Sequence, residues 1–133
     1  MVEWGPVNDG LPHITRPVTA ELVAANVREV LESNEVERFA ELLSPDVHWG
    51  PPGDATAPCQ NRKQVLRWYS KGREAGRRVS TVTEVEVHGD AVLVGMHLEG
   101  EGERWQVLRV GPEGVNDIRG FEDRVQAGAQ VLL

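Results

Sequence analysis

Apolar residues recur every three or four positions in three segments of the first half of the chain, which predicts three helices. The first begins after Thr19, a residue type favoured as a helix N-cap, and carries on one face Leu22, Val23, Asn26, Val27, Val30 and Leu31. A short second helix is expected from about Glu35 to Leu43, ended by Pro45. The third, over about residues 62–75, follows a capping-box-like start at Asn61 and Gln64, and its inner face carries Val65, Leu66, Trp68 and Tyr69.

The pattern changes to strict alternation in the second half, after a short strand at 46–49 and a loop rich in glycine and proline. Turns at 88–90, 100–102 and 111–114 predict a four-stranded meander. If each turn is symmetric, one face holds Thr81, Thr83, Val85, Val87, Val92, Val94, Met96, Leu98, Gln106, Leu108, Val110, Asp117 and Arg119. Gln106 is then opposite Arg119, and a shift of one residue at the last turn would move Asp117 and Arg119 to the other face.

The other face of this meander is charged, as a solvated face should be, but it also carries four large apolar residues. They are Leu93, Trp105, Val107 and Ile118. An exposed apolar patch of this size usually marks an interface, so we expect a homodimer that forms through it.

Length and composition limit the classes of function. The 133 residues fit one domain, 19–133, after an arm, 1–18, whose prolines and glycines exclude regular structure. The net charge of −7 argues against a nucleic-acid partner, and no apolar run is long enough to span a membrane. Neither a secretory signal nor a second cysteine beside Cys59 is found, so a cytoplasmic location is the default expectation.

Three segments resemble the nuclear transport factor 2-like superfamily, and more closely its SnoaL-like, ketosteroid-isomerase-like members. They are "VERFAELLSPDVHW", "CQNRKQVLRWY" and "RWQVLRVGPEGVNDIRGFEDR", and the resemblance covers about residues 20–125. It implies an α+β fold in which a cone-shaped, curved antiparallel sheet wraps around an N-terminal helix hairpin and a third helix and encloses a pocket. Because this fold serves isomerases, cyclases, dehydratases, epoxide hydrolases and binding modules, the function must be argued from the site.

The active sites of these relatives match this sequence only in part. The carboxylate base of the steroid isomerases aligns with Pro51, their tyrosine with Val27 and their protonated aspartate with Gln106. Epoxide hydrolases of the limonene-epoxide type use two aspartates around an arginine. Asp117 would supply one of the aspartates and Arg119 the arginine, and the second aspartate has no matching position. SnoaL-type cyclases use an aspartate base in an apolar cavity, a role that only Asp117 could fill in the predicted register.

The sequence therefore predicts a small-molecule-binding protein, and possible acid–base chemistry without a cofactor on an apolar cyclic substrate. The candidate catalytic residues are Asp117 as the base, Arg119 as its orienting partner and Gln106 as a donor to an oxyanion. The candidate wall of the pocket consists of Trp49, Trp68, Tyr69, Met96, Asn26 and Leu108. Two alternatives stay open: a non-catalytic ligand-binding or dimerisation module, and an epoxide hydrolase. Asp117 and Arg119 can also form a structural ion pair.

Other chemistry-bearing residues give weaker signals. The histidines at 13, 48, 88 and 97 never stand at metal-ligand spacing, so no metal site is expected. Asp46 and His48 alternate with Trp49, so they should not face the same side as the tryptophan. Cys59 fits a small buried apolar residue better than an activated thiol.

Overall fold

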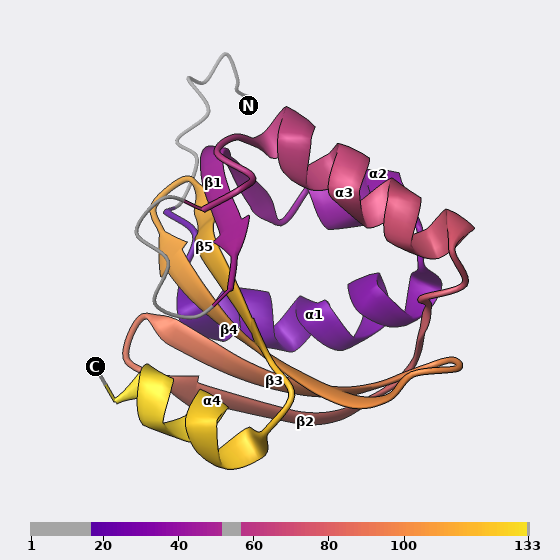
Figure 1. Ribbon diagram of the computed structural model, residues 1–133. Helices are drawn as coiled ribbons and strands as arrows, with labels where there is room; N and C mark the ends of the chain where they lie inside the picture. Colours follow the sequence, from indigo (N-terminus) through magenta and orange to yellow (C-terminus); the bar gives the residue numbers. More distant parts are fainter. Residues whose placement is uncertain (1–16, 52–56, 133) are drawn as a thin grey trace, which may run out of the picture.

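The computed structural model describes residues 17–51 and 57–132, so the predicted arm lies almost entirely outside the described residues. The chain folds as a five-stranded sheet with helices on both of its faces, which confirms the α+β class (Figure 1). The elements in chain order are α1 Ala20–Ser33, α2 Val36–Ala40, β1 Leu43–Gly50, α3 Arg62–Glu74, β2 Val79–His88, β3 Ala91–Leu98, β4 Gly102–Gly111, β5 Gly114–Phe121 and α4 Arg124–Val131.

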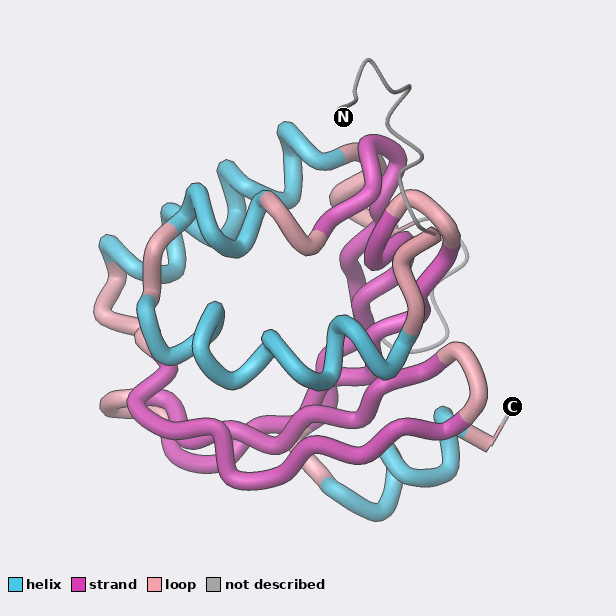
Figure 2. Tube along the Cα trace, turned by 180° about the vertical axis from the view of Figure 1, so that it is seen from behind, coloured by secondary structure: helices cyan, strands magenta, loops and turns pink. Residues whose placement is uncertain are grey.

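The sheet is mixed rather than antiparallel, which corrects the prediction. Its strand order is β1-β5-β4-β3-β2, and β1 pairs in parallel with β5 at the edge. Pro45 lies within β1 instead of simply ending the second helix, and an edge strand tolerates proline because its outer backbone groups need no partner. The strands curve around α1, which lies on the concave side, while α4 lies on the opposite face (Figures 1 and 2).

Local sequence signals place the helices. The Thr19 side chain accepts a hydrogen bond from the Leu22 amide, and the Asn61 side chain accepts one from the Gln64 amide, so both predicted N-caps are confirmed. Asn34 ends α1 in the left-handed conformation, with φ of 56°. Its side chain also binds both backbone polar groups of Val79, which fixes the end of α1 against the start of β2.

The main hydrophobic core lies between α1 and the concave face of the sheet. It includes Val23, Val27, Val92, Val94 and Leu108 from the predicted inner faces. The prediction that Thr81 and Thr83 also point inward is wrong, because β2 contains an irregularity between Val82 and Glu84 that shifts its register to β3. Beyond it the buried side chains are those of Val82 and Val79.

A second core lies on the outer face, where an exposed patch was predicted. Helix α4 packs there, and Leu93 and Val107 are each only 1% exposed beneath it, with Trp105 packed at the side. The fourth member of the predicted patch, Ile118, belongs to the main core instead. The prediction of a solvent-exposed apolar patch is therefore wrong. The homodimer was predicted from that patch, so this observation no longer supports it.

Candidate ligand pocket

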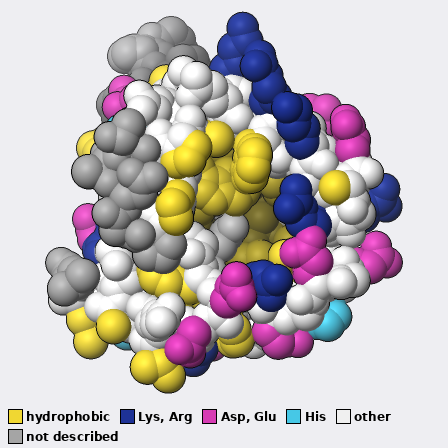
Figure 3. Space-filling view, viewed as in Figure 1, with side chains coloured by type: hydrophobic (Ala, Val, Ile, Leu, Met, Phe, Trp, Pro, Cys, Tyr) yellow, Lys and Arg dark blue, Asp and Glu magenta, His cyan; other side chains and the backbone are white. Residues whose placement is uncertain are grey.

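A cavity of about 170 Å³ opens between α3 and the concave side of the sheet. Its wall is mostly hydrophobic, and Figure 3 shows it as a hollow lined by apolar side chains. The lining residues are Leu31, Phe39, Trp49, Trp68, Tyr69, Gly72, Arg77, Val79, Met96, Leu98 and Gln106. They come from two sides of the molecule, with α1, α2 and α3 facing the strands.

Aromatic rings make up the deep part of this wall. Phe39 of α2 stacks on Tyr69 of α3, with ring centroids 4.3 Å apart and an interplanar angle of 19°, and meets the edge of Trp49 at 6.2 Å. Trp49 is held at the end of β1 by two backbone hydrogen bonds to Cys59, which lies just before α3. These contacts fix the orientation of the rings and give an aromatic wall suited to a ring-shaped ligand.

Tyr69 also carries an unpaired polar atom: its hydroxyl is buried and finds no hydrogen-bond partner among the described residues. Burial raises the pKa of Tyr69, and the positive charge of Arg73 one turn along α3 only partly opposes this effect. The phenol therefore keeps its proton at neutral pH and remains a hydrogen-bond donor.

Arg77 and Gln106 are the other polar residues of the wall. Arg77 follows the end of α3, where Gly76 has a φ of 91° and the Arg77 amide donates back to the Gly72 carbonyl at 2.8 Å. This is a Schellman-type helix end, and it turns the arginine toward the cavity. Gln106 lies in the middle of β4, paired with Val94 and Gly120.

The predicted catalytic pair lies elsewhere. The register between β4 and β5 is symmetric at the turn but shifts between Arg109 and Val110, so that Asp117 pairs with Arg109 and Arg119 pairs with Val107. Both side chains consequently leave the inner face, which Ile118 occupies. The prediction that Gln106 lies opposite Arg119 is wrong.

Asp117 and Arg119 form the structural ion pair that was the alternative interpretation. The guanidinium of Arg119 contacts both carboxylate oxygens of Asp117 at 3.0–3.2 Å and donates to the Pro51 carbonyl at 2.8 Å. The pair thereby joins β5 to the end of β1. Neither residue lines the cavity, so no observed contact supports their predicted catalytic roles.

The predicted wall residues divide into two groups. Trp49, Trp68, Tyr69 and Met96 line the cavity together with Gln106. Leu108 is buried in the core behind the wall, and Asn26 is exposed on α1, where its amide donates to the Leu22 carbonyl. Sequence reasoning missed Phe39 as a lining residue, although its place on the apolar face of the second helix was a usable signal, and it missed Arg77, which only the geometry of the helix end places.

Other singled-out residues do not contribute to the cavity. His48 is exposed while Trp49 faces the pocket, as the alternation predicts, and Asp46 accepts a hydrogen bond from Ser44 at 2.6 Å that lowers its pKa. Cys59 is buried, and burial raises its pKa, which does not favour a thiolate. Within residues 17–51 and 57–132, no group of three or more metal-binding side chains occurs, and no helix is long and apolar enough to cross a membrane.

Comparison with known proteins adds the family. The profile of the SnoaL-like domain matches residues 24–121. The chain is a member of the SnoaL-like domain family. None of the curated proteins matches its sequence significantly.

Solved structures share the fold of this SnoaL-like chain at low sequence identity. A proposed ketosteroid isomerase from Kribbella flavida is 22% identical, with a TM-score of 0.60, over 77% of this chain and 76% of that protein. An NTF2-like protein from Burkholderia thailandensis is 15% identical, with a TM-score of 0.64, over 87% and 98%. A proposed polyketide cyclase from Sinorhizobium meliloti is 17% identical, with a TM-score of 0.60, over 74% and 93%. At such identities these similarities establish the fold alone.

Proposed function

We propose that this SnoaL-like protein binds a small, largely apolar cyclic molecule that carries an oxygen atom. The observation that carries the proposal is the hydroxyl of Tyr69, a residue that lines the cavity: the hydroxyl is buried and has no partner among the described residues. Buried polar groups in folded proteins are almost always hydrogen-bonded, and an unpaired one costs about 1–3 kcal/mol. A ligand oxygen would remove this cost, and the rings of Trp49 and Phe39 would hold the apolar part.

The same wall favours binding over proton transfer. Among the described residues, the cavity is lined by no aspartate, glutamate or histidine, so the proton acceptor of an isomerase or cyclase is missing there. The pair of Asp117 and Arg119 offers no acid–base site for an epoxide hydrolase either, because it lies on the other face of the sheet. If the protein catalyses a reaction, Tyr69 and Gln106 would act as neutral donors to a developing oxyanion, with the base supplied from outside this wall.

Gly72 provides a direct test, because it lines the cavity from α3. A Cβ atom built on Gly72 meets only the Arg77 guanidinium, at 3.6 Å or more, so a side chain fits without moving the backbone. Gly72→Leu should fill the cavity and abolish binding of the neutral fluorescent probe N-phenyl-1-naphthylamine, measured by titration. Gly72→Ala is the matched control and should keep the binding. Both variants should gain about 0.5–1 kcal/mol of stability from improved helix propensity.

The proposal also predicts the effect of removing the hydroxyl. Tyr69→Phe keeps the ring stacked on Phe39, so it should keep affinity for the hydrocarbon probe and lose affinity for 1-naphthol, which carries an oxygen. A wild-type protein that binds neither molecule, or a Gly72→Leu variant that binds both normally, would contradict the proposal.

A further inference from the structure

The positive charge of this acidic protein is concentrated in one segment. Residues 62–78, which are α3 and the turn after it, contain seven of the 14 Lys and Arg residues and a single acid, Glu74. The segment thus has a formal charge of +6 in a chain of −7. Both lysines of the chain, Lys63 and Lys71, lie within it.

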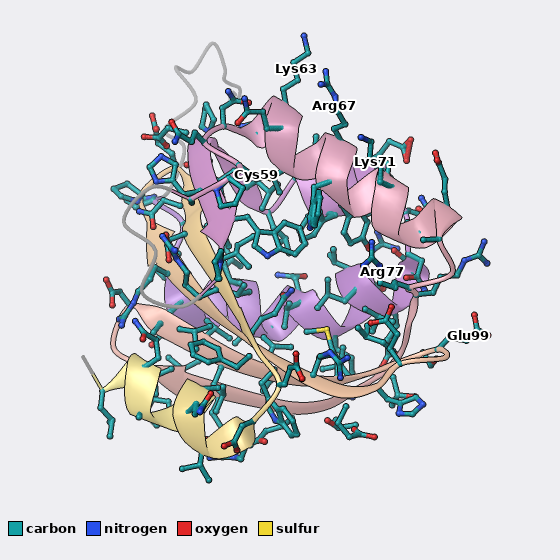
Figure 4. The ribbon with its side chains drawn as sticks, in the orientation of Figure 1. Cys59, Lys63, Arg67, Lys71, Arg77 and Glu99 are labelled. Carbon is teal, nitrogen blue, oxygen red and sulfur yellow. The ribbon has the colours of Figure 1, made fainter. Side chains whose placement is uncertain are left out.

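Three of these cations form a ridge along α3, which we call the basic ridge: Lys63, Arg67 and Lys71. They are four residues apart, so they lie on one side of the helix, and all three are exposed. Figure 4 shows them along the outer side of α3, and in Figure 3 a row of Lys and Arg side chains borders the apolar hollow. None of them has an acidic partner within 4 Å among the described residues, where the partly exposed arginines Arg38 and Arg109 are paired.

This arrangement is unfavourable for the isolated helix. Like charges at this spacing destabilise a helix by about 0.2–0.5 kcal/mol for each pair. Glu74, the one acid of the segment, forms no ion pair within 4 Å with the ridge among the described residues. A bound anion would supply the missing attraction.

Arg77 extends the positive charge into the cavity. It lines the wall, and Figure 4 shows it below α3, at the opening. Its Nε lies 3.6 Å from Glu101, but the same carboxylate is also shared with Arg104, at 3.7 Å. The three side chains together keep a net positive charge next to the apolar wall. Another acid of the β3–β4 hairpin, Glu99, is exposed and points away from the opening at the tip of the hairpin (Figure 4).

We infer that the ligand of the pocket carries an anionic group, a carboxylate, sulfate or phosphate, which lies at the mouth against Arg77 and is attracted by the basic ridge. The inference rests on the proposed function and specifies its ligand as an amphiphile with an apolar ring and a negative end. A small anion fits better than a nucleic acid, because the ridge is one helix wide and the rest of the chain carries a formal charge of −13, which repels a long polyanion.

Two related fluorescent probes test this inference. N-phenyl-1-naphthylamine is neutral, and 8-anilinonaphthalene-1-sulfonate has the same two ring systems with one sulfonate added. The measured quantity is the ratio of their dissociation constants in each variant at low salt, so that differences intrinsic to the probes cancel. Two variants remove positive charge, Arg77→Gln at the wall and Arg67→Gln/Lys71→Gln on the ridge. Gln126→Glu/Ala129→Glu on α4 is the matched control, because it lowers the net charge by the same two units on the opposite face of the sheet.

Near a surface, each cation within several ångströms of the sulfonate should strengthen its binding about twofold to fivefold. We therefore expect both charge-removing variants to weaken binding of the sulfonate, relative to the neutral probe, by about threefold to tenfold. Because Arg67 and Lys71 do not line the cavity, the ridge variant should leave binding of the neutral probe unchanged. The control variant should change neither, and 0.5 M NaCl should suppress most of the wild-type preference because salt screens exposed charges.

The outcomes separate this inference from the proposed function. If the neutral probe binds in the cavity but the ratio is the same in wild type, both charge-removing variants and the control, the anionic ligand is refuted and the pocket stands. An equal loss in the control and ridge variants would also refute it, because the effect would then belong to net charge. If neither probe binds and Gly72→Leu changes nothing, the pocket itself is refuted.

Discussion

Replacing Leu93 with alanine tests whether the outer face of the sheet is covered by the chain's own C-terminal helix. Leu93 is 1% exposed and lies in a cluster with Val107, Phe121, Ala127 and Val131, the last two from α4. A leucine at this depth that is truncated to alanine loses its transfer free energy and leaves a cavity, which together cost about 2.7–5 kcal/mol. The small residues of α4 give the helix room to collapse inward, so we expect a value near the lower end, about 3 kcal/mol.

The assay is equilibrium unfolding in urea, followed by tryptophan fluorescence, with Leu22→Ala as the control. Leu22 is 50% exposed on α1, and its truncation should change the free energy of unfolding by no more than about 0.5 kcal/mol. The m value should stay the same in both variants if only stability changes. A loss below 1 kcal/mol for Leu93→Ala would mean that α4 does not cover this face. A loss that grows with protein concentration would mean that a second chain covers it instead.

Two further predictions concern the ends of α1 and the pocket phenol. Asn34→Gly keeps the left-handed conformation but removes both hydrogen bonds to Val79, so it should lower the free energy of unfolding by about 2 kcal/mol. Asn34→Ala should cost about 1 kcal/mol more, because alanine disfavours a φ of 56°. Equal losses of stability in the two variants would contradict this prediction. Tyr69 is the single tyrosine of the chain, so an ultraviolet titration reports its ionisation alone. Because its pKa is raised, the native protein should ionise at a higher pH than the urea-unfolded protein, in which the pKa should be about 10. Because the unfolded phenol releases its proton first, stability should be constant below pH of about 10 and fall as the pH rises toward the native pKa; native ionisation at the unfolded value would rule this out.

Much of the fold could be predicted because its signals are local. The N-caps at Thr19 and Asn61 act within one turn of their helices, and the apolar spacing of α1 reflects the face that it buries. The register of β3 with β4 also keeps the predicted sides, so Met96 and Gln106 reach the cavity as expected. These features depend on residues close in sequence or on the alternation of side chains between the two faces of a strand. A tight turn fixes which residues of the next strand share a face.

The remaining features depend on contacts that the sequence does not display. Helix α4 has a weak apolar pattern, with Gly128 at its centre and Val125 exposed, so only the outer face of the sheet explains why it forms. The parallel pairing of β1 with β5 joins strands that are distant in the chain. The register shifts in β2 and between Arg109 and Val110 interrupt the strands of a curved sheet. No residue type at these positions predicts a register shift.

One of these irregularities determines which face of the sheet carries the predicted base. The shift beside Val110 places Ile118 on the inner face, within the main core, and moves Asp117 to the outer face. The described wall offers only neutral donors, Tyr69 and Gln106, and a positive charge. Such a set stabilises negative charge on a bound molecule but removes no proton from it. This set of side chains supports the proposal of a ligand that already carries an anionic group, and the comparison of the two naphthalene probes tests it.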